Sequence, residues 1–350
     1  MITVIMPDAS KELEQYANQI LKDINHDRII DEQDIKKDEL SKITRLLLMV
    51  QLDEWGQNLP LMHLLKRMDQ MNPHSFSGCT AMFVVKSNNQ WFTKSFASGL
   101  IFILNQKGCR FIGHPLLEMT KGLNNLNRWE KTSGIPREQL ILKMGKQGVQ
   151  RLLHFSGVRS AEPRVTVLHA SSKKISNTLQ LWHMVRDSLP SLQIDEFHVE
   201  NGTLIDCIGC RYQTCLYYGR QKSCFYGGDM IKEIFPAMEK AQALVWVCPN
   251  YNDALSANLT AVINRMTALY RTMSFYDKTI FSVIVSGNSG SDSVARQLIG
   301  SLNVNKGFQL PPHFCLTATA YEPGSIMESP NIKKRAADFA AHINKELSTS

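Results

Sequence analysis

The sequence lacks long apolar runs, a dense set of cysteines and any concentrated block of charge. Its longest apolar candidates, residues 98–104 and 243–248, fall far short of the roughly 18 residues of a membrane-spanning helix. Eight cysteines in 350 residues are too few for a disulfide scaffold. The opening residues, MITVIMPDAS, meet a proline and an acid too early for a secretory signal. We therefore expect a cytoplasmic protein with no membrane partner.

The charge is positive but dispersed. Lys and Arg number 39 against 32 for Asp and Glu, a net charge of +7, with only short basic clusters. A nucleic-acid binder usually concentrates such charge on one face, so we expect no nucleic-acid partner and interpret the excess as favouring an anionic ligand. The hydrophobic fraction of 43% is typical of globular proteins and excludes disorder as the main state, and the length favours two domains.

Short apolar, β-branched runs alternate with longer stretches of helical periodicity. This alternation is typical of βαβ units and predicts an α/β fold, with parallel sheets covered by helices on both faces. The clearest expected strands are residues 2–6, 45–50, 81–86, 164–169, 244–248 and 280–286.

The chain also contains a divergent internal repeat. Its matches are collinear: residues 2–4 with 165–167, LPLMHLLKRM (59–68) with ANLTAVINRM (257–266), and residues 84–89 with 283–288. Chance similarity between any two βα units is the alternative, but three matches in order favour duplication. We predict two domains, residues 1–155 and 160–350, and an insertion in the second copy that includes four of the cysteines.

In the second copy the first strand leads into HASSKKISNT, followed by a helix. Hydroxyls, an amide and lysines at the start of a helix suit a phosphate, because backbone N–H groups and the helix dipole attract anions there. A simple N-cap is the alternative, but it needs only one such residue. The equivalent loop of the first copy, PDASKELE, carries three acids that would repel a phosphate. We expect the anion site only in the second copy.

Two further polar loops of the second copy, residues 248–256 and 286–291, follow later strands. Ligands of open parallel sheets bind at this edge. Pro249 and Tyr251 offer an apolar wall, and Gly287 and Gly290 let backbone donors approach closely. Each loop alone could be a surface turn, but three polar loops at one edge favour a ligand site.

These motifs together carry a family resemblance. Residues 164–343, with SSKKISNT, CIGC, GDMIKEIFPAMEKAQALVWVCPNYNDALSANLTAVINRM and VSGNSGS, resemble flavodoxin-fold NAD(P)H-dependent FMN reductases and their iron–sulfur flavoprotein relatives. The resemblance implies two tandem flavodoxin-like domains, the first degenerate, with FMN as cofactor and NAD(P)H as electron donor. One departure is that Ser172 and Ile175 stand where proline and a polar residue or glycine are commoner.

The resemblance also implies roles for individual residues. Around the FMN phosphate it places Ser171, Ser172, Lys173, Ser176, Asn177 and Thr178. Beside the isoalloxazine it places Pro249, Asn250, Tyr251 and Asn252, and at the pyrimidine edge Ser286, Gly287, Asn288, Ser289 and Gly290. It requires no catalytic side chain, because the cofactor performs the chemistry.

The four clustered cysteines are compatible with three hypotheses: an iron–sulfur centre, a structural zinc or no cluster. They are spaced Cys207-x2-Cys210-x4-Cys215-x8-Cys224, and such thiols can hold an iron–sulfur centre or a structural zinc. The iron–sulfur relatives bring the third cysteine closer, so we favour no cluster, and the sequence does not decide whether a metal binds.

The predicted function is an FMN-dependent oxidoreductase. It would transfer hydride from NAD(P)H to flavin and then electrons to a small-molecule acceptor such as a quinone, flavin or azo compound. An electron-transferring iron–sulfur flavoprotein and a non-catalytic flavin sensor are the alternatives. We also expect a homodimer, or a first copy that closes one side of the site as a built-in partner.

Overall fold

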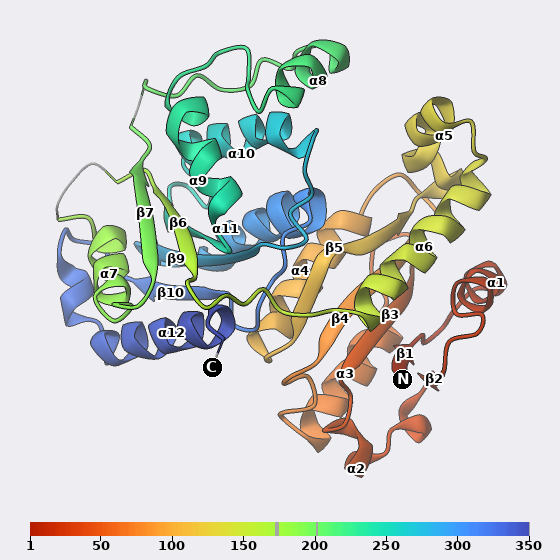
Figure 1. The fold of residues 1–350 in the computed structure, drawn as a ribbon. Coiled ribbons are helices and arrows are strands. Elements are labelled where there is room, and N and C mark those ends of the chain that lie inside the picture. The colour runs from red at the N-terminus through yellow and green to blue at the C-terminus, as the bar shows by residue number, and fades with distance from the viewer. Residues whose placement is uncertain (172–174, 201, 350) are drawn as a thin grey trace. The chain divides into compact units, whose positions relative to one another are not determined.

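The computed structural model describes residues 1–171, 175–200 and 202–349. The predictions for Ser172 and Lys173 lie outside these residues. Contacts divide the chain into two units, coloured red to yellow-green and green to blue in Figure 1. Unit 1 comprises Met1–Ser156 with Asn303–Asn305, and unit 2 comprises Gly157–Leu302 with Lys306–Ser350.

Unit 1 is built on a five-stranded parallel sheet in the order β2-β1-β3-β4-β5. The strands are β1 (Ile2–Ile5), β2 (His26–Ile29), β3 (Arg45–Leu52), β4 (Thr80–Ser87) and β5 (Arg110–Met119). The α-helices are α1 (Lys11–Ile20), α2 (Lys37–Leu40), α3 (Leu59–Met71), α4 (Thr93–Gln106), α5 (Asn127–Ser133) and α6 (Arg137–Leu153). Two 3-10 helices are η1 (Glu32–Asp34) and η2 (Lys121–Leu126).

Unit 2 repeats this arrangement in the order β7-β6-β8-β9-β10. The strands are β6 (Arg164–His169), β7 (Gln193–His198), β8 (Ala243–Pro249), β9 (Thr279–Ser286) and β10 (Cys315–Thr319). The helices are α7 (Asn177–Arg186), α8 (Tyr212–Arg220), α9 (Phe235–Lys240), α10 (Ala257–Tyr270), α11 (Ser291–Leu298) and α12 (Ile332–Leu347), with η3 (Met230–Ile234), η4 (Ile299–Val304) and η5 (Ser325–Glu328).

Both sheets have the flavodoxin-like strand order 2-1-3-4-5. The prediction of two tandem flavodoxin-like α/β domains is therefore confirmed. The repeat places β1 on β6, β3 on β8 and β4 on β9, and each pair occupies the same position in its sheet. The insertion falls where residues 199–242 of unit 2 replace the shorter connection 30–44 of unit 1.

The six strands expected from the sequence are the central ones of the two sheets, and all six form. The four that the sequence did not reveal, β2, β5, β7 and β10, are the sheet edges. Edge strands are less buried and carry a weaker apolar signal, as the half-exposed strand QIDEFH of β7 illustrates.

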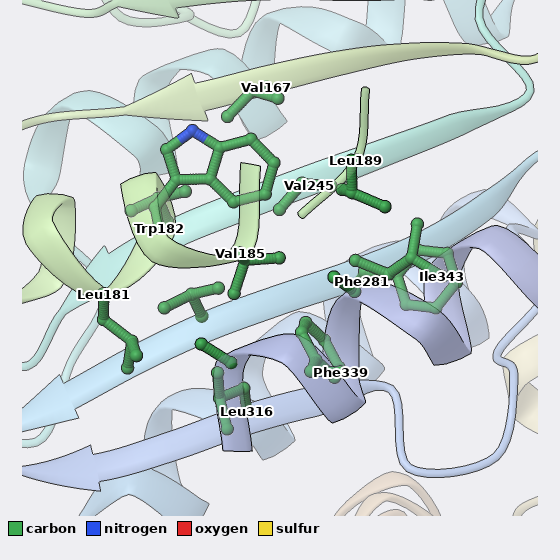
Figure 2. Close-up of a cluster of buried hydrophobic side chains, with 14 of the residues drawn as sticks. Val167, Leu181, Trp182, Val185, Leu189, Val245, Phe281, Leu316, Phe339 and Ile343 are labelled. Carbon is green, nitrogen blue, oxygen red and sulfur yellow. The ribbon is translucent and has the colours of Figure 1, made fainter. Parts of the chain in front are cut away.

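A buried apolar cluster fixes α7 against the sheet of unit 2 (Figure 2). Trp182 of α7 is fully buried, and its Nε1–H donates a hydrogen bond of 2.8 Å to Glu196 Oε2. Phe339 and Ile343 of α12 join the same cluster, while α9, α10 and α11 lie on the opposite face of the sheet (Figure 1). This packing sets the first turn of α7 at the end of β6.

No helix in the described ranges 1–171, 175–200 and 202–349 is both long and apolar enough to cross a bilayer.

Candidate ligand-binding site

A cavity of about 670 Å³ opens at the carboxyl ends of β6, β8, β9 and β10 in unit 2. Its volume lies within the range of roughly 300–1,000 Å³ that is usual for ligand sites. The described residues of its wall are 170, 171 and 175–178, then 249–251 and 256–258, then 285 and 287, and finally 320, 321 and 323. None of the described lining residues carries a charge, and those residues offer backbone N–H groups and neutral polar side chains.

The first turn of α7 forms one end of the cavity. Ser176 is the N-cap: its Oγ accepts from Leu179 N–H at 3.4 Å and donates to Ser171 Oγ at 3.1 Å. The N–H groups of Asn177 and Thr178 belong to the first turn, where the helix dipole is positive. Ser171, Ser176, Asn177 and Thr178 all line the cavity, so the structure brings them to one anion-attracting end.

The side chain of Asn177 already has protein partners. Its Nδ2–H groups donate to Ala320 O at 3.3 Å and Glu322 O at 2.8 Å, and its Oδ1 accepts from Ile326 N–H at 3.1 Å. The amide therefore holds the loop that follows β10, and only the backbone N–H of Asn177 is left for a ligand.

Asn250 joins the loop after β8 to the loop after β9. Its Nδ2–H groups lie 3.0 Å from Ser286 Oγ, 3.0 Å from Ser289 O and 3.1 Å from Asp253 Oδ1. Its Oδ1 is buried and has no hydrogen-bond partner within the described part of the chain. Since buried acceptors are rarely left unpaired, this orphaned oxygen suits an N–H group of a ligand.

Two glycines shape the loop after β9. Gly290 has φ +84°, and a Cβ there would lie 1.7 Å from Asp253 Oδ1. A Cβ on Gly287 would come within 3.1 Å of the Tyr321 ring, which lines the cavity. The missing side chains thus leave room for Asp253 and for an aromatic wall. Tyr251 forms a second exposed aromatic wall on the loop after β8.

The residues named from the sequence fall into three groups. Those that line the cavity are Ser171, Ser176, Asn177, Thr178, Pro249, Asn250, Tyr251 and Gly287. Those that lie in the neighbouring loops without lining it are Asn252, Ser286, Asn288, Ser289 and Gly290. Ser172 and Lys173 lie outside the described residues.

Part of the cavity wall comes from residues that the sequence-based site residues do not include. Val285, Ala320, Tyr321 and Pro323 line the cavity, as do Ser256, Ala257 and Asn258 at the start of α10. The loop after β10 gave no signal because β10 itself, an edge strand, was not recognised. Ser256 had one usable signal, since it stands directly before a helical segment.

His169 lies at the end of β6, just before the predicted phosphate loop. It is buried, stacks on His198 with ring centroids 4.9 Å apart, and its Nε2 lies 3.6 Å from Glu196 Oε1. Burial lowers the pKa of His169, and the Glu196 carboxylate opposes this shift. His169 is therefore a neutral support of the strand end near pH 7.

The four clustered cysteines line a separate cavity of about 120 Å³ beside the second half of α10. Arg265 and Arg271 share its wall. Across the described residues, no three side chains of His, Cys, Asp or Glu meet in a metal-binding arrangement. Cys248 lies elsewhere, inside the sheet, where burial raises the pKa of its thiol to about 12.

The strand order and the site together define a class of protein. A flavodoxin-like sheet, a helix N-terminus facing the cavity, neutral polar loops and two aromatic walls are the features of a domain that binds a mononucleotide with a planar ring. FMN fits them, because the α7 end suits its phosphate and the orphaned Asn250 Oδ1 suits a ring N–H.

Residues 163–321 match the family model described as NADPH-dependent FMN reductase. The resemblance found in the sequence is confirmed over residues 163–321, and residues 1–156 of unit 1 lie outside the match. The family supports FMN as the cofactor with NAD(P)H as the electron donor, as the sequence predicted. No curated protein shows significant similarity to the chain.

Solved structures similar to this chain each cover about half of it. An azoreductase from Bacillus anthracis str. Sterne has 11% identity and a TM-score of 0.38 over 52% of this chain and 98% of its own. An NAD(P)H:quinone oxidoreductase from Methanothermobacter marburgensis has 15% identity and a TM-score of 0.39 over 52% and 100%. A Fusobacterium nucleatum flavodoxin bound to flavin mononucleotide has 16% identity and a TM-score of 0.31 over 43% and 96%.

Proposed function

We propose that unit 2 is an FMN-dependent NAD(P)H oxidoreductase that reduces planar aromatic acceptors such as quinones, flavins or azo compounds. The observation that carries the proposal is one cavity lined by the first turn of α7, by two tyrosines and by Asn250, whose buried Oδ1 has no hydrogen-bond partner among the described residues. FMN, when bound, accepts a hydride from NAD(P)H and passes the electrons to the acceptor.

The protein's part in this function is to hold and orient the cofactor. The N–H groups of Asn177 and Thr178, with the hydroxyls of Ser171 and Ser176, would bind the phosphate. The Asn250 bonds keep the loops after β8 and β9 together, so that their backbone donors keep a fixed geometry. Fixed donors stabilise charge on a ring better than water that must reorganise.

The acceptor class follows from the chemistry of the walls. Tyr251 is 58% exposed and Tyr321 is 76% exposed, and both line the cavity. Exposed aromatic faces favour flat, apolar partners through offset or edge-to-face contacts. The described lining has no acid or base, so proton exchange with the ring would go through water.

The test is flavin binding followed by turnover. The full-length protein should quench FMN fluorescence on titration and should oxidise NADPH or NADH with a soluble quinone as acceptor. Initial-rate plots against both substrates should give parallel lines, because one cavity admits donor and acceptor in turn.

Intersecting lines would contradict the shared pocket. FMN binding without oxidation of either nicotinamide would contradict the catalytic role and favour the sensor. No uptake of FMN would contradict the proposal as a whole.

A further inference from the structure

The first turn of α10 faces the cavity without a side-chain cap. Ser256, Ala257 and Asn258 line the cavity, and among the described residues no side chain accepts from the first N–H groups of this helix. The first helical hydrogen bond runs from Thr260 N–H to Ser256 O at 3.0 Å. The N–H groups of Ala257, Asn258 and Leu259 precede that bond, at the positive end of the dipole.

The hydroxyl of Ser256 is buried at the same place. Ser256 is 8% exposed, and its Oγ makes no hydrogen bond to any described residue. The nearby amide of Asn258 does not supply a partner, because its Nδ2–H donates instead to Val199 O at 2.7 Å. A buried hydroxyl rarely stays unpaired, so we expect a partner other than the described residues.

Unit 1 provides an internal control. In the repeat that aligns residues 59–68 with 257–266, Asn58 is the counterpart of Ser256. Asn58 is also buried, but its Oδ1 accepts from Leu61 N–H at 2.8 Å and its Nδ2–H donates to Gln51 O at 2.8 Å. Unit 1 therefore closes the end of α3 with its own side chain, whereas unit 2 leaves the matching end of α10 open to the cavity.

The charges around this end allow an anion to bind. The first turn of α10 contains no acidic residue. Asp253 is close in sequence, but its Oδ1 accepts from Asn250 Nδ2–H and lies against Gly290, in the loop after β9. FMN has a single phosphate, and the α7 end, with two hydroxyls beside its first turn, suits it. The α10 end is then left for a second anionic group.

We propose that Ser256 and the first N–H groups of α10 bind an anionic group of the second molecule that enters the cavity. This inference rests on the proposed function. Two sources share the required chemistry: a phosphate of NAD(P)H, or a carboxylate or sulfonate on the acceptor. Unit 2 is thereby selective for substrates that carry an acid group, and Ser256 is a specificity-determining residue.

Calorimetric titration of the full-length, FMN-loaded protein tests the proposal at equilibrium, without turnover. The ligands are NADP⁺, anthraquinone-2-sulfonate and the neutral 2-(hydroxymethyl)anthraquinone. The proteins are wild type, Ser256→Ala, Ser256→Asn and the unit 1 control Asn58→Ala. Ser256→Asn transplants the cap of unit 1 and should occupy the N–H groups of α10.

We expect Ser256→Ala to lower the affinity for one or both anionic ligands about tenfold, and Ser256→Asn to lower it further. The neutral anthraquinone should bind the four proteins alike, and Asn58→Ala should match wild type throughout. A loss of affinity for NADP⁺ alone assigns the site to the donor phosphate. A loss of affinity for the sulfonate alone assigns it to the acceptor.

Two results would overturn the proposal. One is that each anion binds the wild type and the Ser256 variants with the same affinity. The other is a weaker FMN affinity of Ser256→Ala in a fluorescence titration, which would place the hydroxyl in the flavin site. Failure of the wild type to bind FMN counts against the proposed function alone, because NADP⁺ can also be titrated into protein without added flavin.

Discussion

The two units share one fold but differ at the carboxyl ends of their strands. In unit 2 the described lining of the cavity carries no charge and includes the first turns of α7 and α10. In unit 1 a cavity of about 430 Å³ at the ends of β4 and β5 is lined by Glu12, Lys86 and Glu138. Lys86, which the repeat aligns with the apolar Val285, pairs with Glu12 at 3.2 Å. The core thus preserves the fold, while a few residues at the strand ends decide what can bind.

Two acids of unit 1 act on a neighbouring tyrosine. Burial raises the pKa of Tyr16, and the carboxylates of Glu12 and Glu138 raise it further. A phosphate placed there would meet these two carboxylates as well. The restriction of the anion site to the second copy stays a prediction, for which these carboxylates give a physical reason.

The largest expected effect comes from giving unit 2 an acid at its phosphate end. Ser176→Asp keeps a residue that can cap α7 but adds a negative charge beside the proposed FMN phosphate. At about 4 Å and an effective dielectric constant near 20 the repulsion is several kcal/mol, so we expect FMN affinity to fall at least 100-fold. Fluorescence titration measures it.

Ser10→Asp is the matched control for this prediction. Ser10 caps α1 in unit 1, where its Oγ accepts from Leu13 N–H at 3.3 Å. This variant should bind FMN as wild type does. Equal losses in both variants would mean that the flavin site does not distinguish the two units.

Gly290→Ala should have the next largest effect. The alanine Cβ would meet Asp253 Oδ1, and φ +84° is strained for any residue with a Cβ, so we expect a loss of about 2–4 kcal/mol in the stability of unit 2. Gly78 in unit 1 has φ +76° but open space around it, so Gly78→Ala should cost only about 1 kcal/mol. Urea unfolding compares the two, and equal losses would show that the Asp253 contact is not rigid.

Replacing the residue before each helix should have smaller effects on stability, and these should differ between the two units. Asn58→Ala removes two hydrogen bonds and should destabilise unit 1 by about 1–2 kcal/mol. Ser256→Ala removes none within the described chain, so unit 2 should lose less than about 0.5 kcal/mol. Hydrogen exchange in the first turns of α3 and α10 measures both, and a larger loss in α10 would contradict the contrast.

The smallest effect is a pH dependence from the histidine at the end of β6 in unit 2. The folded pKa of His169 lies below its ordinary value near 6.5, so the unfolded chain takes up the proton first as pH falls. Stability should therefore decrease from pH 6.5 down to the folded pKa and then level off. His169→Gln should reduce this slope in thermal unfolding, and an unchanged slope would contradict the prediction.

Much of the fold could be predicted because its signals are local. The central strands β1, β3, β4, β6, β8 and β9 are continuous apolar runs, and the repeat placed each on its counterpart. The edge strands β2, β5, β7 and β10 are partly exposed, so their composition does not separate them from loops. The Ser-rich loop, Pro249 and Gly287 were visible for the same reason, since each has a local composition typical of a ligand loop.

The sequence by itself determined two flavodoxin-like units, and it predicted a polar, glycine-containing anion site in only one of them. Only the tertiary structure decided which side chains are free to bind. The side-chain amide of Asn177 makes its hydrogen bonds to residues 320–326, and the donors of Asn250 bond to residues 286–289. These partners lie too far away in the sequence for a local pattern to predict them. The same holds for Ser256: a hydroxyl before a helix predicts a cap, and only its packing shows that the cap bond is not made.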